Sequence, residues 1–130
     1  MMLNWFILIA AASTNSNFTE QFAIGQTVDL SQGFYVCGTS NSVETMQRII
    51  SERDAQKRRA LATSLHCPFE QREDRSNLRE VVKIEAENCG PLQRLGDGQM
   101  CGDESHILKV KDAKGQVVTV IFMADDYIFD

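Results

Sequence analysis

Alternating hydrophobic and polar residues predict three strands in the second half of the chain. Residues 78–87 alternate between apolar and charged side chains, which is typical of a strand with one buried face. Residues 106–110 repeat this pattern, and residues 117–123 form a mainly apolar run, as expected for a strand covered on both faces. A tight turn ending in Gly115 separates the last two segments, so we predict a three-stranded antiparallel meander. In the first strand, the side chains expected to be buried are Leu78, Val82, Ile84 and Ala86.

Residues 41–67 predict a helical segment. Asn41 and Glu44 have the spacing of a capping box, in which each side chain bonds a free backbone amide of the first turn. A helix is therefore expected to start here. Its apolar stripe begins with Val43, Met46 and Ile50.

This apolar stripe does not continue through the whole segment. An unbroken helix would place Asp54, Lys57 and Arg58 on the buried face, and burying those charges is costly. We therefore predict a break near Arg53, with Asp54 capping a second helix that Pro68 ends. The second helix is expected to bury Ala55, Leu61, Ala62 and Leu65.

A further strand is expected before the helices. Residues 33–37 are aromatic and β-branched between glycines, which favours a short strand that ends at Cys37. Residues 89–102 are rich in glycine and predict a long loop. The chain is therefore expected to be one α+β domain over residues 26–130, with a short N-terminal strand, a broken helix made of two short helices, and the antiparallel meander.

The cysteine pattern predicts a disulfide framework. The four cysteines are even in number and contain no C-x-x-C pair. Four cysteines allow three connectivities, and we favour the pairing of sequence neighbours because each pair brackets one coherent segment. The favoured bonds are Cys37 with Cys67 and Cys89 with Cys101.

The N-terminal residues have features of an export signal. Residues 1–12 carry no charge and end in Ala10-Ala11-Ala12, which fits an A-x-A cleavage site before Ser13. The apolar run is too short to span a bilayer, which needs about 20 residues. We expect residues 1–12 to be a signal peptide and residues 13–25 a flexible lead-in. The alternative is an N-terminal element packed in the core of a cytosolic protein.

The charge balance argues against nucleic acid as a partner. The chain holds 13 basic and 18 acidic residues, a net charge of −5, which repels phosphate backbones. The one basic cluster, residues 57–59, has no interleaved aromatic for base stacking and is interpreted as a solvated helix face.

No common catalytic or metal-binding motif is present. Only His66 and His106 could supply a histidine base, and neither lies in a known signature. A small hydrolase that uses one of them with an unrecognised nucleophile is the alternative from the enzyme class. Every interval between cysteines is at least a dozen residues, whereas structural zinc sites bring ligands in close pairs. We therefore expect no metal and no cofactor, with a zinc-stabilised cytosolic protein as a third alternative.

The leading hypothesis is a non-enzymatic binding or accessory protein of a bacterial envelope. A loop stapled by Cys89 and Cys101 suits recognition, because ordering it in advance lowers the entropy cost of binding a protein partner. Export and disulfides indicate a periplasmic or extracellular location with no membrane span in the mature chain. The candidate binding residues in and beside this loop are Arg94, Asp97, Asp103 and Glu104, whose acids are expected to be solvated.

Overall fold

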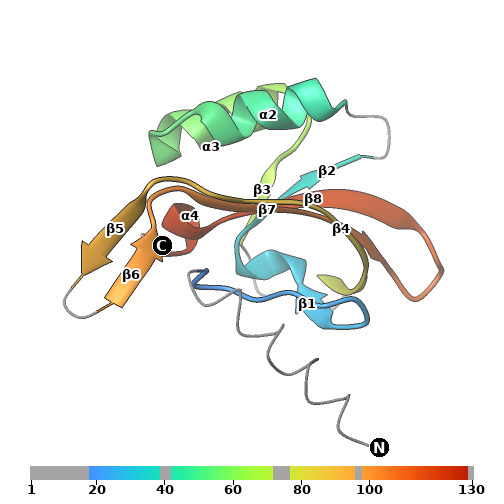
Figure 1. The fold of residues 1–130 in the computed structure, drawn as a ribbon. Coiled ribbons are helices and arrows are strands. Elements are labelled where there is room, and N and C mark those ends of the chain that lie inside the picture. The colour runs from blue at the N-terminus through green and yellow to red at the C-terminus, as the bar shows by residue number, and fades with distance from the viewer. Residues whose placement is uncertain (1–17, 39–41, 72–76, 96–97, 129–130) are drawn as a thin grey trace, which may run out of the picture.

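The computed structural model describes residues 18–38, 42–71, 77–95 and 98–128. Its main feature is a curved six-stranded antiparallel sheet in the order β1-β4-β7-β8-β2-β3, and a separate two-stranded sheet pairs β5 with β6 (Figure 1). The mixed helix and strand content places the chain in the predicted α+β class. The elements are β1 (Thr27–Asp29), the 3-10 turn η3 (Leu30–Gln32), β2 (Phe34–Cys37), α2 (Val43–Ser51), α3 (Ala55–Ser64), β3 (Phe69–Glu70), β4 (Leu78–Cys89), β5 (Leu92–Leu95), β6 (Gly98–Cys101), β7 (Glu104–Lys111), β8 (Val117–Met123) and α4 (Ala124–Ile128).

The predicted meander is confirmed as β4, β7 and β8, but β4 buries a different set of side chains. Val81 is fully buried, whereas Leu78 is 48 % exposed and Ala86 is exposed. The register between β4 and β7 shifts twice, once before Lys83 and once before Ala86. Ile84, predicted to be buried, does pack against the core. Each shift reverses which side of the strand faces the core, so strict alternation missed Val81 and wrongly buried Leu78 and Ala86.

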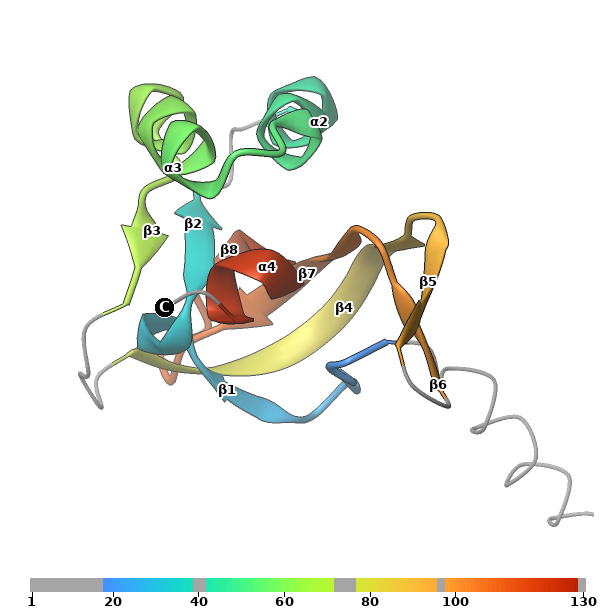
Figure 2. The same ribbon diagram turned by 90° about the vertical axis from the view of Figure 1, so that its left-hand side faces the viewer.

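Strand β8 lies inside the sheet and separates two hydrophobic cores. Its residues 120–123 are all buried, as the continuous apolar run predicted. One core lies under α2 and α3, and the other lies on the opposite face, where β1 and η3 fold over the sheet (Figure 2). The core under the helices contains Tyr35, Cys37, Met46, Ile49, Ala62, Cys67, Ile107, Ile121 and Met123. The opposite core contains Val28, Leu30, Phe34, Val81, Leu108, Val110, Val120, Phe122 and Ala124.

The broken helix is confirmed, with α2 and α3 side by side on one face of the sheet (Figure 2). Asp54 caps α3 by accepting a hydrogen bond from the Lys57 amide at 3.0 Å, as predicted. The cap of α2 is Ser42, which accepts from the Thr45 amide, and Asn41 lies outside the described residues.

The burial of α3 differs from the sequence expectation. Of the residues expected to be buried, Ala62 alone is fully covered, and Ala55, Leu61 and Leu65 are half-buried. Arg58, interpreted as part of a solvated face, is 1 % exposed. The correction has a physical cause, since carboxylates from a distant part of the chain neutralise this guanidinium.

Several short elements were not predicted. They are β1, η3, β3 and α4, each five residues or fewer. The glycine-rich segment, expected as a loop, contains the β5–β6 hairpin. Residues 18–25, expected as part of a flexible lead-in, run along the face that carries β1 and contact the sheet through Thr19 and Glu20. Residues 1–17, including the expected signal peptide, lie outside the described residues.

Two disulfides cross-link the fold. Cys37 of β2 bonds Cys67, which follows α3, and Cys89 at the end of β4 bonds Cys101 at the end of β6. This is the favoured pairing of sequence neighbours. Both disulfides favour an oxidising, non-cytosolic compartment. Within the described part of the chain, no helix combines the length and apolar character needed to cross a bilayer.

Candidate functional site

The β5–β6 hairpin projects from the end of the curved sheet, and we refer to residues 89–101 as the stapled arm (Figures 1 and 2). Its strands pair only with each other in a sheet of their own. An isolated two-stranded hairpin is marginally stable in water. The Cys89–Cys101 disulfide closes the base of the arm and compensates for this weakness.

The base of the arm is held by Asp103. The Gly90 amide donates to the Asp103 carbonyl at 3.2 Å, and a Cβ at Gly90 would lie 3.0 Å from the Cβ of Asp103, so only glycine fits without a shift. The Asp103 carboxylate also pairs with Arg53, which lies between the two helices, at 3.1 Å. This pair is exposed and contributes little to stability. It nevertheless places the turn between the helices beside the arm.

The predicted binding residues that the structure describes differ in their surroundings. Arg94 is exposed on β5, and Asp97 lies outside the described residues. The side chain of Asp103 is 41 % exposed at the base of the arm. The expectation of a solvated loop acid is wrong for Glu104, which begins β7 and is 4 % exposed. Its carboxylate is buried because partners from the lead-in and from His106 satisfy it.

Glu104 and Glu87 flank the buried ring of His106, and we call these three residues the histidine cluster. The Nε2 atom of His106 lies 2.7 Å from Glu104 Oε2, and its Nδ1 atom lies 2.9 Å from Glu87 Oε2. The ring is fully buried, and Phe18, Phe22 and Phe122 pack around it with centroids 5.0–5.8 Å away. Each ring nitrogen of His106 therefore faces a carboxylate oxygen at hydrogen-bond distance.

Glu104 links this cluster to the lead-in. Its Oε1 atom accepts hydrogen bonds from the Thr19 amide at 2.7 Å and the Thr19 hydroxyl at 2.6 Å, and its Oε2 atom accepts from the Glu20 amide at 3.1 Å. Burial alone would raise the pKa of Glu104, but the bonds from His106 and Thr19 outweigh burial and lower this pKa below its ordinary value. The ionised carboxylate therefore fastens a segment 85 residues away in sequence.

The histidine cluster holds chain segments together around an enclosed imidazole ring. A general base needs a nitrogen that can accept a proton from a bound molecule. Both nitrogens of His106 are engaged by carboxylates, and the ring is fully buried. His66 lies in the turn after α3 with a left-handed backbone, at φ 66°, and its side chain is exposed.

Arg58 is the centre of a second buried cluster, which we call the arginine cluster. Its Nε atom donates to the Tyr35 hydroxyl at 3.2 Å and to Asp126 Oδ2 at 3.1 Å, and its Nη2 atom donates to Asp125 Oδ1 at 2.7 Å. The Nη1 atom donates to the Glu52 carbonyl at 2.6 Å. Arg58 therefore joins α3 to β2, to the turn before α3 and to α4.

Burial and charge act against each other in the arginine cluster. Burial opposes the charge of Arg58, but Asp125 and Asp126 outweigh it and raise the pKa of the guanidinium. Burial also raises the pKa of the Tyr35 hydroxyl, which donates to Asp126 Oδ2 at 2.7 Å. Tyr35 therefore stays protonated and serves as a fixed donor. Sequence patterns missed this cluster because its members come from four separate elements.

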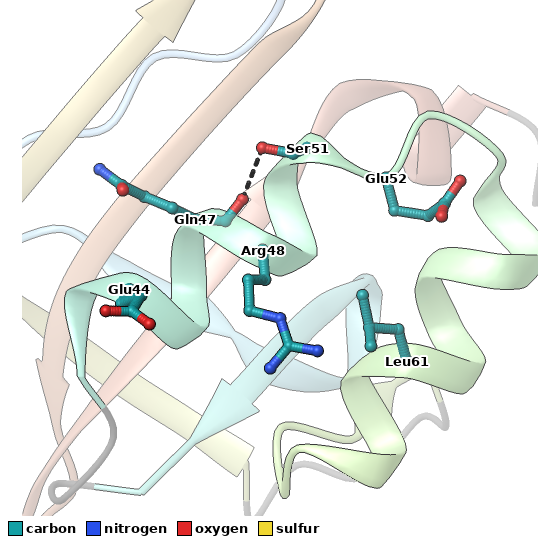
Figure 3. Close-up of a pocket in the computed structure, with 6 residues that line it drawn as sticks. All are labelled: Glu44, Gln47, Arg48, Ser51, Glu52 and Leu61. Carbon is teal, nitrogen blue, oxygen red and sulfur yellow. Dashed lines mark hydrogen bonds between the residues drawn. The ribbon is translucent and has the colours of Figure 1, made fainter.

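A groove of about 400 Å³ runs between α2 and α3 (Figure 3). Arg48 of α2 and Leu61 of α3 face each other across it, and Glu44, Gln47, Ser51 and Glu52 complete the lining. The exposed side chains carry charges of both signs. The groove therefore has no single electrostatic preference that would identify a ligand.

The described residues contain no group of three or more metal-binding side chains arranged to hold an ion. All four cysteines are in disulfides, so they offer no thiolate to the zinc site considered as an alternative.

No protein-family model matches the chain, and no match is found among curated proteins or among solved structures. The geometry of the chain's own residues therefore carries the functional proposal.

Proposed function

We propose that this chain is a small exported binding or accessory protein of the bacterial envelope, without catalytic activity, that engages a protein partner through the stapled arm. The observation that carries this proposal is the arm itself, a covalently closed hairpin that extends away from the six-stranded sheet. A projecting hairpin gains little from the protein's own core. Its disulfide therefore has a clear role as a device that orders a contact surface before binding.

The exposed side chains of the arm support this role. Arg94 and Leu92 are both exposed, and Leu92 is 49 % accessible. Arginine is enriched at protein interfaces and among the residues that dominate their binding energy, so Arg94 is the side chain of the arm that best supports a contact with a partner. The periplasm or the extracellular space would preserve the disulfide on which this surface depends.

Site-specific photocrosslinking tests the proposal. A benzoylphenylalanine placed at Arg94 is expected to capture one discrete partner in envelope extract from the native host. The matched control is the same substitution at Lys114, which is exposed. Lys114 lies in the turn between β7 and β8, and this turn lies at the opposite end of the sheet from the arm (Figure 1). Equal capture from both positions, or capture from neither, would contradict binding through the arm.

The disulfide provides a second test with the captured partner. The double substitution Cys89→Ser and Cys101→Ser is expected to weaken partner binding about tenfold, because the arm must then be ordered on binding. The fold should persist, since the arm forms its own small sheet. Unchanged affinity of the double variant would show that ordering the arm has no role in recognition.

A further inference from the structure

A cavity of about 350 Å³ opens on the face of the sheet opposite α2 and α3. Phe22 of the lead-in, Phe34 of β2 and Phe122 of β8 line its apolar side. Their ring centroids lie 6.1, 5.5 and 5.6 Å apart, so the three rings make one continuous aromatic surface. A concave site of this size with an aromatic wall is typical of small-molecule binding.

The polar lining of this cavity carries negative charge. Glu20 and Asp29 both line it, and none of the described lining residues is basic. The whole chain has a net charge of −5, which adds to the local field. Anions are therefore disfavoured, whereas a cation is attracted by the carboxylates and can place its apolar substituents against the aromatic lining.

The two carboxylates are attached to ordered backbone. Asp29 accepts hydrogen bonds from the Ser31 amide at 3.0 Å and the Ser31 hydroxyl at 2.6 Å, and both bonds end on Oδ1. Ser31 thus orients the carboxylate through one of its two oxygens. The backbone of Glu20 is fixed by its hydrogen bond to Glu104. The cavity is therefore formed before any ligand arrives, which lowers the cost of binding.

We propose that this cavity binds an organic cation, with the ammonium group near Glu20 and Asp29 and its carbon substituents against the three phenylalanines. The site is distinct from the stapled arm and does not depend on the proposed partner. A free amine and a lysine side chain of another protein share this chemistry. The experiment separates these two sources.

The charge requirement is tested with choline and its uncharged isostere, 3,3-dimethyl-1-butanol. We expect choline to bind about tenfold more tightly, because the isostere matches its shape and lacks its charge. Titration followed by NMR should move the amide signals of Phe22, Val28 and Asp29. Equal affinity of the two compounds, or shifts located elsewhere, would overturn the proposal.

The carboxylates are tested with the double substitution Glu20→Gln and Asp29→Asn. Both changes keep the size of the side chain, and the amide oxygen introduced at position 29 can still accept from Ser31. Choline affinity is expected to fall about tenfold. Glu44→Gln, an exposed change on α2 across the sheet, is the matched control and should leave affinity unchanged. If the double variant binds choline as tightly as the natural chain, the assignment is wrong.

The source of the cation is tested with Nα-acetyl-lysine amide in the same titration. Tighter binding of this compound than of choline identifies a protein side chain as the ligand. Tighter binding of choline identifies a free amine. If neither cation binds the natural chain at concentrations up to about 50 mM, any affinity would be too weak to matter, and the cavity is no cation site.

Discussion

The arginine cluster and the histidine cluster lie on opposite faces of one sheet, and each ties down a segment distant in sequence. Arg58 is bonded to carboxylates 67 and 68 residues later, and Glu104 is bonded to an amide 85 residues earlier. Both clusters bury charge, yet they hold different kinds of structure. The arginine cluster fixes helices over a core, whereas the histidine cluster fixes an irregular segment.

The two faces also differ in covalent support. The Cys37–Cys67 disulfide reinforces the helix face next to the arginine cluster, and the described part of the lead-in contains no cysteine. Asp126 is fully buried, but Glu87 at the edge of the histidine cluster is 29 % exposed. Loss of the arginine cluster should therefore unfold the domain, while loss of the histidine cluster should release a segment locally.

The largest effect is expected from Arg58→Met. This change removes the buried cation that pairs with Asp126 and leaves the Tyr35 hydroxyl and Arg59 beside that carboxylate, which should lower the free energy of unfolding by about 3–5 kcal/mol. Urea denaturation followed by circular dichroism measures it. Arg48→Met, an exposed change on α2, is the control and should stay within about 0.5 kcal/mol. A loss below about 1 kcal/mol for Arg58→Met would show that the arginine cluster does not hold the helix face.

A smaller effect with a local character is expected from Glu104→Gln. The amide keeps one acceptor but loses the charge that binds His106 and Thr19, at a cost of about 1–3 kcal/mol. Hydrogen exchange at Thr19 and Glu20 should rise more than exchange in β7 or β8. Glu85→Gln on β4 serves as the control. Uniform acceleration across the sheet would contradict the local role assigned to this cluster.

Acid should separate the two clusters without any mutation. Because the pKa of Glu104 is lowered in the folded chain, its contribution to stability is complete above its unfolded pKa of about 4.3 and is lost as pH falls through the lower folded value. Burial raises the pKa of Asp126, so protonation there acts in the opposite direction. As pH falls, Asp126 therefore takes up its proton before Glu104, so NMR amide signals around Arg58 and Asp126 should move first, and those of Thr19 and Glu20 should move later, below about pH 4.

The smallest effect is expected from Glu87→Gln. This carboxylate is partly exposed, and the substituted amide oxygen can still accept from His106, so the loss should stay below about 1 kcal/mol. Thermal unfolding measures it beside Glu104→Gln. If both substitutions lower the free energy of unfolding equally, the exposure of a carboxylate in the histidine cluster does not determine how much it stabilises the fold.

The long, strongly patterned elements could be predicted from the sequence. Alternation predicted β4 and β7, continuous apolar residues predicted β8, and the charge of Asp54 in an apolar stripe predicted the helix break. The short elements could not be predicted, because β1 and β3 owe their form to pairing with distant strands. Pattern alone also missed the burial of Val81 in β4, since the register shifts arise from the fit of this strand to β7.

The buried charges were hidden for a related reason. In the sequence, Arg58 is one of three adjacent basic residues, and no neighbouring residue distinguishes it from Lys57. Its burial depends on Tyr35 and Asp126, which the fold brings together from separate elements. Glu104 likewise depends on Thr19. A local sequence pattern shows that burying a charge would be costly. The opposite charges and hydrogen bonds that offset this cost come from the tertiary structure.

Arg58 imposes an order on the assembly of the molecule. During synthesis this guanidinium leaves the ribosome well before residues 125 and 126, which supply its carboxylates. Until then, seating α3 on the sheet would bury an unmatched positive charge. We therefore expect the helices to dock late, after residues 125 and 126 have been made.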